Sequence, residues 1–312
     1  MKIKKTLVKK TLVLAGIDWG TTHRRTYALD AAGQCTQELS DGNGALACQG
    51  NFPGKLHEVL IKLPQTPEMI ILSGMVGSAL GWHNVPYLDH QVALQDLHQY
   101  LFRVQDAQFS GDCAIVPGYC IRNTQGQPDV MRGEETQLLG ACALGHRTGW
   151  FVLPGTHSKW VELHEGKILQ LRTYMTGELF HLLSHHGTLA ASMGADSAWS
   201  DAAFAAGVHA AKQGVLAHQL FSGRAKVVCG DMPASDARAY LSGVLIGSEL
   251  HDVFTTQALA TQSTTFKIIA SPDLAMRYQQ AAQLLPVSSH ALDSKDVFLA
   301  AMRFFQNHWS PT

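Results

Sequence analysis

The sequence predicts an α/β protein built from two similar halves. One observation is a duplicated pattern. An apolar run, a Gly-Thr turn and an alternating strand occur in LVLAGIDWGTTHRRTYAL, and again where LPGTHSKW lies between the apolar WFVL and the alternating VELHEG. A second observation is that each copy continues into a third strand, which makes a three-strand meander. A third is that helix-like segments follow both meanders, as is typical of α/β folds.

The first half is expected to begin with a buried strand at residues 12–18. An antiparallel neighbour should follow at 24–29, and the third strand of the meander at 34–39. The segment KLHEVLIKL at 55–63 places apolar residues at helical spacing and predicts a helix. MIILSG at 69–74 predicts a further strand.

The second half repeats this order, with strands at 150–154, 159–163 and 167–175. A helix is expected over 177–186, then a strand at 266–270 that leads into a helix beginning at Pro272. We place the boundary between the halves near Gly149. Residues 1–148 are therefore expected to form one lobe and residues 149–312 the other.

Length and charge limit the classes of function. A chain of 312 residues exceeds the usual ~100–200 residues of one domain. Its 24 Lys and Arg residues balance 25 Asp and Glu residues, so no overall field favours nucleic acid or anionic lipid. The N-terminal MKIKKTLVKKTLVLAG has too short an apolar part for a signal peptide and is interpreted as a basic segment before the first strand. We expect a cytoplasmic protein with small-molecule partners and no nucleic-acid or membrane partner.

The two Gly-Thr turns are candidates for binding a polyphosphate. Taken singly, each is explained as an ordinary tight turn, in which Gly supplies a positive φ and Thr a local hydrogen bond. Together they repeat one combination of exposed backbone, hydroxyl groups and nearby cations, Arg24 and Arg25 in the first copy and Lys159 in the second. Such groups suit a phosphate chain. Asp18, at the end of the first strand, would then be the outer partner of Mg²⁺, which takes few carboxylates and keeps several waters.

Five motifs occur in one order along the chain: IDWGTT, SGMVGSALGW (73–82), DVMRGEETQLLGA (129–141), LPGTHSKW and MTGELFHLL (175–183). Together they closely resemble the motifs of the 2-dehydro-3-deoxygalactonokinases, sugar-acid kinases of the actin/hexokinase/Hsp70 superfamily. DWGT alone would be a weak signal. The five motifs in this order are specific, and the resemblance runs roughly from Asp18 to Leu250.

The resemblance implies a duplicated, ribonuclease H-like fold of two lobes with an ATP cleft between them. It also implies ATP-dependent, Mg²⁺-assisted phosphorylation of the terminal 6-hydroxyl of 2-dehydro-3-deoxy-D-galactonate, in D-galactonate breakdown. Asp18 would hold Mg²⁺ through water. By match of motif, the phosphate loops would comprise Gly20, Thr21, Thr22, Arg25, Gly155, Thr156, His157, Ser158 and Lys159.

Phosphoryl transfer also needs a carboxylate that accepts the proton of the attacking hydroxyl. The acidic cluster before the helix-like QLLGACAL is the best candidate, and we favour Glu134, with Asp129 next. The alternative is that the acids only complement the helix dipole in the first turn, which we expect for one of Glu134 and Glu135. The identity of the base stays open among these three.

The sugar acid bears a carboxylate, so a cation should meet it. Arg132 offers the planar fork that suits a carboxylate, although an ion pair with Glu135 or Asp129 is the alternative. The loop at 73–78, with two glycines and two serines after a strand, would admit a polyol; a plain turn beside a core Trp82 is the alternative. The expected substrate-binding residues are Ser73, Gly74, Met75, Gly77, Ser78, Trp82, Arg132 and Glu135.

Two readings from other classes remain open. One is a non-catalytic, nucleotide-gated sugar-acid sensor, and the other is a phosphate-releasing hydrolase on the same fold. A kinase for the gluconate-derived C4 epimer is a further alternative. The adenine contacts near Ala270 are undefined, since this chain has Ala270 and Ser271 where the family's pattern usually has Gly. Helix faces around 235–250 suit either a core or a homodimer interface.

Overall fold

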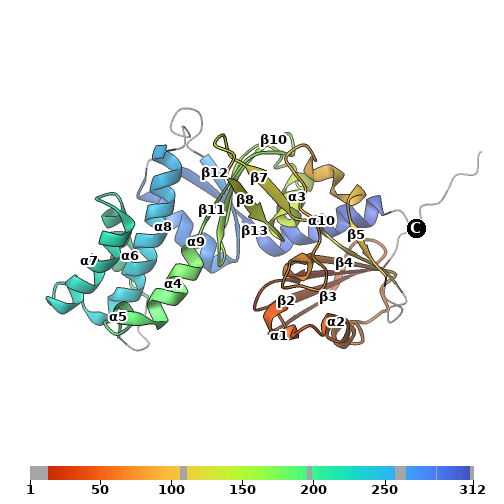
Figure 1. Cartoon of the computed structure of the whole chain (residues 1–312), viewed down its shortest axis with the longest axis horizontal. Helices are drawn as coiled ribbons and strands as arrows, with labels where there is room; N and C mark the ends of the chain where they lie inside the picture. The colour runs from red at the N-terminus through yellow and green to blue at the C-terminus, as the bar shows by residue number, and fades with distance from the viewer. Residues whose placement is uncertain (1–12, 106–110, 195–198, 257–264, 286, 310–312) are drawn as a thin grey trace, which may run out of the picture. The chain divides into compact units, whose positions relative to one another are not determined.

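The structure is a computed structural model that describes residues 13–105, 111–194, 199–256, 265–285 and 287–309 (Figure 1). Its two main sheets have the strand orders β3-β2-β1-β4-β6-β5 and β11-β10-β9-β12-β13. In both, the first strand of the half lies centrally. The consecutive meander strands flank it on one side, and a strand reached by a crossover flanks it on the other. The predicted α/β class with a duplicated, ribonuclease H-like strand arrangement is confirmed.

The first sheet contains β1 (Leu14–Trp19), β2 (Arg24–Leu29), β3 (Cys35–Asp41), β4 (Met69–Gly74), β5 (Phe102–Val104) and β6 (Asp112–Ile115). β1 pairs antiparallel with β2 and parallel with β4. Every residue of β4 is buried, which explains why its sequence is apolar without alternation. Helices α1 (Ala45–Cys48) and α2 (Phe52–Leu60) supply Cys48, Phe52 and Leu56 to the core on one face of this sheet.

Helix α10 (Ser294–His308) packs on β1 because Gly16 has no side chain. A Cβ at Gly16 would lie 2.5 Å from the sulfur of Met302. Gly140 on α3 (Glu134–Ala143) allows a similar approach, since a Cβ there would collide with the carbonyl oxygen of Val297. The remaining elements of this half are η1 (Met75–Gly77), η2 (Leu94–Gln99), β7 (Tyr119–Arg122) and β8 (Pro128–Met131).

The second sheet contains β9 (Gly149–Leu153), β10 (Ser158–His164), β11 (Lys167–Tyr174), β12 (Thr265–Ala270) and β13 (Ser288–Asp293). Its helices are α4 (Thr176–His185), α5 (Gly187–Ala190), α6 (Asp201–Ala211), α7 (Leu216–Val228), η3 (Ala234–Asp236), α8 (Ala237–Thr256) and α9 (Pro272–Gln283). Helices α6 and α8 approach closely at Gly207 and Gly243, where a Cβ on either would collide with a carbonyl oxygen of the other helix. The glycines of YLSGVLIGSEL therefore serve helix packing.

Two compact units emerge from the contacts. The first consists of residues 1–148, 163–169 and 295–312, and the second of residues 149–162 and 170–294. The tip of the β10–β11 hairpin and nearly all of α10 thus belong with the first unit. This division of the chain has more than one boundary along the sequence. A division into lobes at 148/149 stays a prediction.

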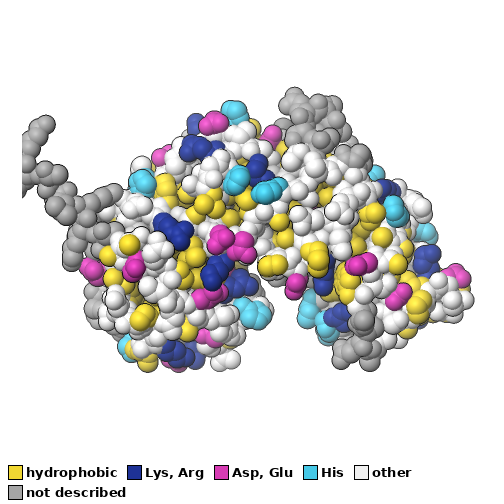
Figure 2. Space-filling view, turned by 180° about the vertical axis from the view of Figure 1, so that it is seen from behind, with side chains coloured by type: hydrophobic (Ala, Val, Ile, Leu, Met, Phe, Trp, Pro, Cys, Tyr) yellow, Lys and Arg dark blue, Asp and Glu magenta, His cyan; other side chains and the backbone are white. Residues whose placement is uncertain are grey.

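The described surface has the mixed charge that the composition suggests. On the face drawn in Figure 2, basic and acidic side chains are interspersed and neither sign forms a broad patch, as the net charge of −1 suggests. Among the residues that the structure describes, no helix is long and apolar enough to cross a membrane. All six cysteines are free thiols.

Candidate active site

Several of the predicted functional residues meet at one edge of the first sheet. Asp18 is the penultimate residue of β1 and lies opposite Ser73 of β4 in the parallel register. The carboxyl ends of both strands therefore face the same edge, where ligands of α/β sheets commonly bind. Helix α3 also begins at this edge. Gly133, which precedes it, packs closely against the end of β4: a Cβ at Gly133 would lie 3.1 Å from the Cα of Gly74. This places Asp18 and the first acids of α3 at one edge.

Asp18 is a partly accessible carboxylate in an acidic setting. Its side chain is 27% exposed, and its Oδ2 accepts a long hydrogen bond of 3.5 Å from Nη1 of Arg25. Burial raises the pKa of Asp18; the Arg25 charge opposes this, and repulsion from Glu134 adds to it. The electrostatic coupling between Asp18 and Glu134 would be relieved by a cation bound beside them.

The two acids at the start of α3 differ in accessibility. Both reach back to the backbone: Arg132 N–H donates to Glu134 Oε2 (2.9 Å) and Gly133 N–H donates to Glu135 Oε2 (2.7 Å). Glu134 is half-buried. Glu135 is fully buried, and this burial, together with repulsion from Glu134, raises its pKa to about 8. Glu135 thus has the environment of an internal helix-capping acid, whereas Glu134 remains accessible for proton transfer.

Asp129 lies elsewhere, on the β7–β8 hairpin. It is opposite Ile121 in that hairpin and accepts a hydrogen bond of 2.8 Å from the N–H of Val130. It therefore belongs to a different element from Asp18 and Glu134. Its predicted role as the second choice of base stays a prediction.

Arg132 is buried and only partly satisfied. Its Nη2 donates to the carbonyl oxygen of Val85 (2.6 Å), and its guanidinium lies 4.2 Å from the ring centre of Tyr87. Nε and Nη1 are buried without a hydrogen-bond partner, and within the described residues Arg132 forms no ion pair. A Cβ at Gly77 would lie 2.9 Å from Nη1, so the glycine leaves that nitrogen uncovered. Buried N–H groups are nearly always paired, so these two suit an anionic ligand.

The rest of the loop predicted to bind the sugar uses its hydroxyls internally. Ser73 is fully buried and its Oγ lies 2.7 Å from Oγ1 of Thr136. Ser78 Oγ donates to the carbonyl oxygen of Met75 (2.8 Å). Met75 and Trp82 are half-buried. The polyol contacts predicted for this loop stay predictions.

The first predicted phosphate loop is the turn between β1 and β2. Gly20 N–H donates to the carbonyl oxygen of His23 (2.9 Å), and Thr22 Oγ1 lies 2.9 Å from Nδ1 of His23. Thr22 and Arg25 are exposed, and Gly20 and Thr21 are half-buried. The hydroxyls and the cation that were expected to meet phosphate are therefore accessible.

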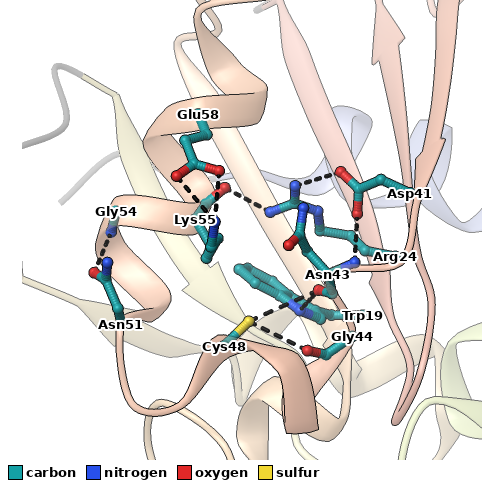
Figure 3. Close-up of polar contacts among 10 residues, drawn as sticks. All are labelled: Trp19, Arg24, Asp41, Asn43, Gly44, Cys48, Asn51, Gly54, Lys55 and Glu58. Carbon is teal, nitrogen blue, oxygen red and sulfur yellow. Dashed lines mark hydrogen bonds and ion pairs between the residues drawn. The ribbon is translucent and has the colours of Figure 1, made fainter.

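A network of polar contacts supports this turn from inside (Figure 3). The Arg24 side chain is 1% exposed, and it donates to Asp41 Oδ2 (2.6 Å) and to the carbonyl oxygen of Lys55 (2.5 Å). Asp41 Oδ1 in turn accepts from Asn43 N–H (2.9 Å), and the carbonyl oxygen of Asn43 accepts from Trp19 Nε1 (2.8 Å). The end of β3 is thus tied to both strands that flank the turn.

The segment after Asn43 contacts the turn directly. Ala45 N–H donates to the carbonyl oxygen of Gly20 (2.9 Å), and Leu46 N–H donates to that of Thr21 (3.2 Å). A Cβ at Gly44 would collide with the backbone of Thr22. Backbone contacts therefore hold the shape of the first loop.

The second predicted phosphate loop joins β9 to β10 and is divided in its exposure. Gly155, Thr156 and His157 are exposed, whereas Ser158 and Lys159 begin β10 and are buried. Ser158 Oγ lies 2.7 Å from the hydroxyl of Tyr278. The phosphate contacts predicted for Ser158 and Lys159 stay predictions.

Helix α4 holds the exposed part of the second loop. Glu178 N–H donates to the carbonyl oxygen of Thr156 (2.8 Å), and the Glu178 carboxylate lies 2.5 Å from Nε2 of His157. A Cβ at Gly177 would collide with the carbonyl oxygen of Gly155. Sequence reasoning did not assign a role to Gly177 or Glu178. Both lie in the motif MTGELFHLL, and this was the signal that could have identified them as functional residues. Tyr278 lies outside the five motifs and carried no local signal.

The chain is similar to known kinases over nearly its whole length. The profile of the family described as 2-keto-3-deoxy-galactonokinase matches residues 18–304. The 2-dehydro-3-deoxygalactonokinase of Escherichia coli (strain K12) is 34% identical over 289 residues, covering 92% of this chain and 95% of that protein. A solved structure from Sinorhizobium meliloti, assigned as a 2-dehydro-3-deoxygalactonokinase, has a TM-score of 0.86 and 31% identity, and the match covers 96% of this chain and 97% of that one.

Proposed function

The chain belongs to the 2-keto-3-deoxy-galactonokinase family, and we propose that it transfers the terminal phosphoryl group of ATP to the 6-hydroxyl of 2-dehydro-3-deoxy-D-galactonate. The resemblance carried by the five motifs is thereby confirmed, and the chain is a phosphotransferase with an alcohol group as acceptor. The observation that carries the proposal is the family match over residues 18–304, which includes four of the motifs and all of IDWGTT except Ile17. The reaction consumes ATP, and we place it in the cytoplasm.

The first site role concerns the nucleotide. We assign the exposed Thr22 and Arg25 of the first loop, and Thr156 and His157 of the second, to the phosphate chain of ATP. The accessibility of these four side chains supports the assignment. Asp18 would hold Mg²⁺, because it is accessible and electrostatically coupled to Glu134, and its contact with Arg25 is long. The bound ion would neutralise charge on the phosphate oxygens.

Glu134 is the proposed general base. As the 6-hydroxyl oxygen forms its bond to the γ-phosphorus, the bond from that phosphorus to the β,γ-bridging oxygen breaks and ADP leaves. The proton of the hydroxyl passes to the Glu134 carboxylate. Glu134 is supported over Glu135 by its accessibility, since Glu135 is fully buried.

Arg132 is the proposed partner of the substrate carboxylate. Its unpaired Nε and Nη1 support this role, because a carboxylate oxygen could accept from both. The ring of Tyr87 and the carbonyl oxygen of Val85 keep the guanidinium in place. A fixed fork recognises a carboxylate better than a mobile ammonium does.

The proposal is tested by measuring ADP release from ATP and Mg²⁺, with and without a panel of 2-keto-3-deoxy sugar acids. The kinase predicts release that depends on the sugar acid, together with a 6-phosphate product. A sensor predicts no turnover, and a hydrolase predicts release that is independent of the sugar acid. Comparing the galactonate- and gluconate-derived epimers would settle selectivity at C4.

A further inference from the structure

Helix α8 carries a buried acid that the proposed reaction does not use. Glu249 lies in the otherwise uncharged segment YLSGVLIGSEL and is 2% exposed. Its carboxylate accepts three hydrogen bonds, from Trp160 Nε1 (2.6 Å), Thr176 Oγ1 (2.5 Å) and the hydroxyl of Tyr278 (2.9 Å). A buried carboxylate is costly unless it is well bonded, so a set of three donors indicates a specific role.

Two of these bonds lead to the strand that follows the second loop. Trp160 lies on β10 and is fully buried. Tyr278, on α9, shares its hydroxyl between Glu249 and Ser158, the first residue of β10. Ser158 and Trp160 are two residues apart, so both point to the same side of the strand, where Glu249 lies. The carboxylate therefore holds the residue at which the exposed loop 155–157 ends.

The third bond leads to the helix that holds the other part of the loop. Thr176 is the first residue of α4. The next two residues contact the loop backbone: Gly177 packs against Gly155, and Glu178 N–H donates to the carbonyl oxygen of Thr156. Glu249 thus connects both supports of the loop through one side chain.

We propose that Glu249 is a positioning residue that holds loop 155–157 in the geometry that binds the phosphate chain of ATP, acting through Thr176 on one side and through Tyr278 and Ser158 on the other. The inference rests on the proposed function. It gives Ser158 a role beneath the loop, which accounts for its burial and its bond to Tyr278. All of these residues belong to the second compact unit.

Single substitutions can cut each connection separately. Tyr278→Phe removes the hydroxyl that joins Glu249 to Ser158, and Thr176→Val removes the bond to α4. Tyr240→Phe is the matched control, because Tyr240 is equally buried in this unit (2%) and its hydroxyl has no part in the network. For the first two variants we expect the Kd for ATP to rise about 10-fold, which is the change in affinity expected from the loss of one hydrogen bond. The KM for the sugar acid should stay unchanged.

A non-kinetic readout separates loop positioning from general loss of stability. Hydrogen exchange of the Glu178 amide, which donates to the loop at the carbonyl oxygen of Thr156, should accelerate in Tyr278→Phe and Thr176→Val, while exchange in β9 stays as in the wild type. Glu249→Gln should keep much of the ATP affinity, because its amide oxygen still accepts from Trp160 and hydroxyls can donate or accept; Glu249→Leu should lose it.

The outcomes are distinct. If both variants match Tyr240→Phe in ATP affinity and in exchange of the Glu178 amide, the positioning role is overturned. The role is also overturned if the sugar-acid KM rises as much as the Kd for ATP. If instead the wild-type chain binds no ATP and releases no ADP, the proposed function itself fails.

Discussion

Arg24 donates a hydrogen bond of 2.6 Å to Asp41 beneath the first predicted phosphate loop, and the two side chains are 1% and 31% exposed. The guanidinium is thus enclosed, while the carboxylate reaches solvent. Because Asp41 also accepts from Asn43 N–H, the pair fixes the start of the segment that contacts the backbone of Gly20 and Thr21. A charged pair in this position makes the loop geometry depend on both partners.

Asp41→Asn should destabilise the fold by about 2 kcal/mol near neutral pH, because it leaves the enclosed Arg24 charge without its partner. Burial acts to raise the pKa of Asp41, but the bonds from Arg24 and Asn43 prevail and lower it below 3.8. The pair's contribution is therefore present above pH 3.8 and is lost as the pH falls further. Urea denaturation at a series of pH values measures the difference, which should shrink in acid.

Asp89→Asn is the control for this change. Asp89 likewise accepts a hydrogen bond from the N–H two residues on, that of Gln91. It should change the free energy of unfolding by only a few tenths of a kcal/mol. Equal losses in both variants would contradict the role assigned to Arg24.

Glu135→Gln should remove a pH dependence of stability. Burial raises the pKa of Glu135 from 4.5 to about 8, so in this window the folded chain holds a proton that the unfolded chain has released. The free energy of unfolding of the wild type should then fall as the pH rises, by up to ~1.4 kcal/mol per unit from this group. In the variant this contribution is absent.

The comparison is made by denaturant unfolding between pH 4.5 and about 8. Asp18 and Glu249 also have raised pKa values, but both are present in the two proteins and their effects cancel. Parallel curves would mean that Glu135 titrates normally in the folded state.

The meanders could be predicted because each of their strands carries its own pattern. Strands β1 and β9 are apolar runs, and turns with Gly follow them. The strand β13, with the sequence SSHALD, has no such pattern and exists through its parallel pairing with β12. Helix α10 was not predicted to join the first unit because its site on β1 depends on the absence of a side chain at Gly16, far away in the sequence.

The candidate site, like the fold, could be predicted where a local motif exists and not where a contact joins distant parts of the chain. Asp18 and Glu134 stand in motifs with a chemical rationale, and the structure brings them to one edge of a sheet. The bond between Ser73 and Thr136 spans residues far apart in the chain, so no local pattern announces it. Glu249 is the one charged residue in the stretch YLSGVLIGSEL, which in retrospect is a signal for a buried polar network.

Asp18→Asn should abolish most of the activity without unfolding the chain. The amide keeps the shape of the side chain but loses the charge that would hold Mg²⁺. We expect kcat to fall by roughly 10²-fold or more, with a shift of the Mg²⁺ titration to higher concentration. Asp30→Asn, in the turn between β2 and β3, serves as the control. A variant with near-normal kcat and Mg²⁺ dependence would place the metal partner elsewhere.

Glu134→Gln should lower kcat by about 10²-fold with little change in either KM, since only proton transfer is removed. The amide oxygen can still accept the bond from Arg132 N–H, so the start of α3 should stay intact. Asp129→Asn, on the β7–β8 hairpin, is the comparison and should retain most of the activity. The reverse ranking would move the base to Asp129, and an effect of Glu134→Gln on KM alone would indicate a positioning role.

Arg132→Lys should raise the KM for the sugar acid by about 10²-fold and leave the KM for ATP unchanged, because an ammonium cannot reproduce the two N–H donors at Nε and Nη1. Arg103→Lys is the matched control, since Arg103 also lies over an aromatic ring, 3.6 Å from the centre of Trp309. The test compares the steady-state kinetics of two substrates: the sugar acid, and an analogue that has an amide in place of the carboxylate. The wild type should discriminate strongly between the two compounds, and Arg132→Lys should do so much less. Equal discrimination in both proteins would mean that another cation meets the carboxylate.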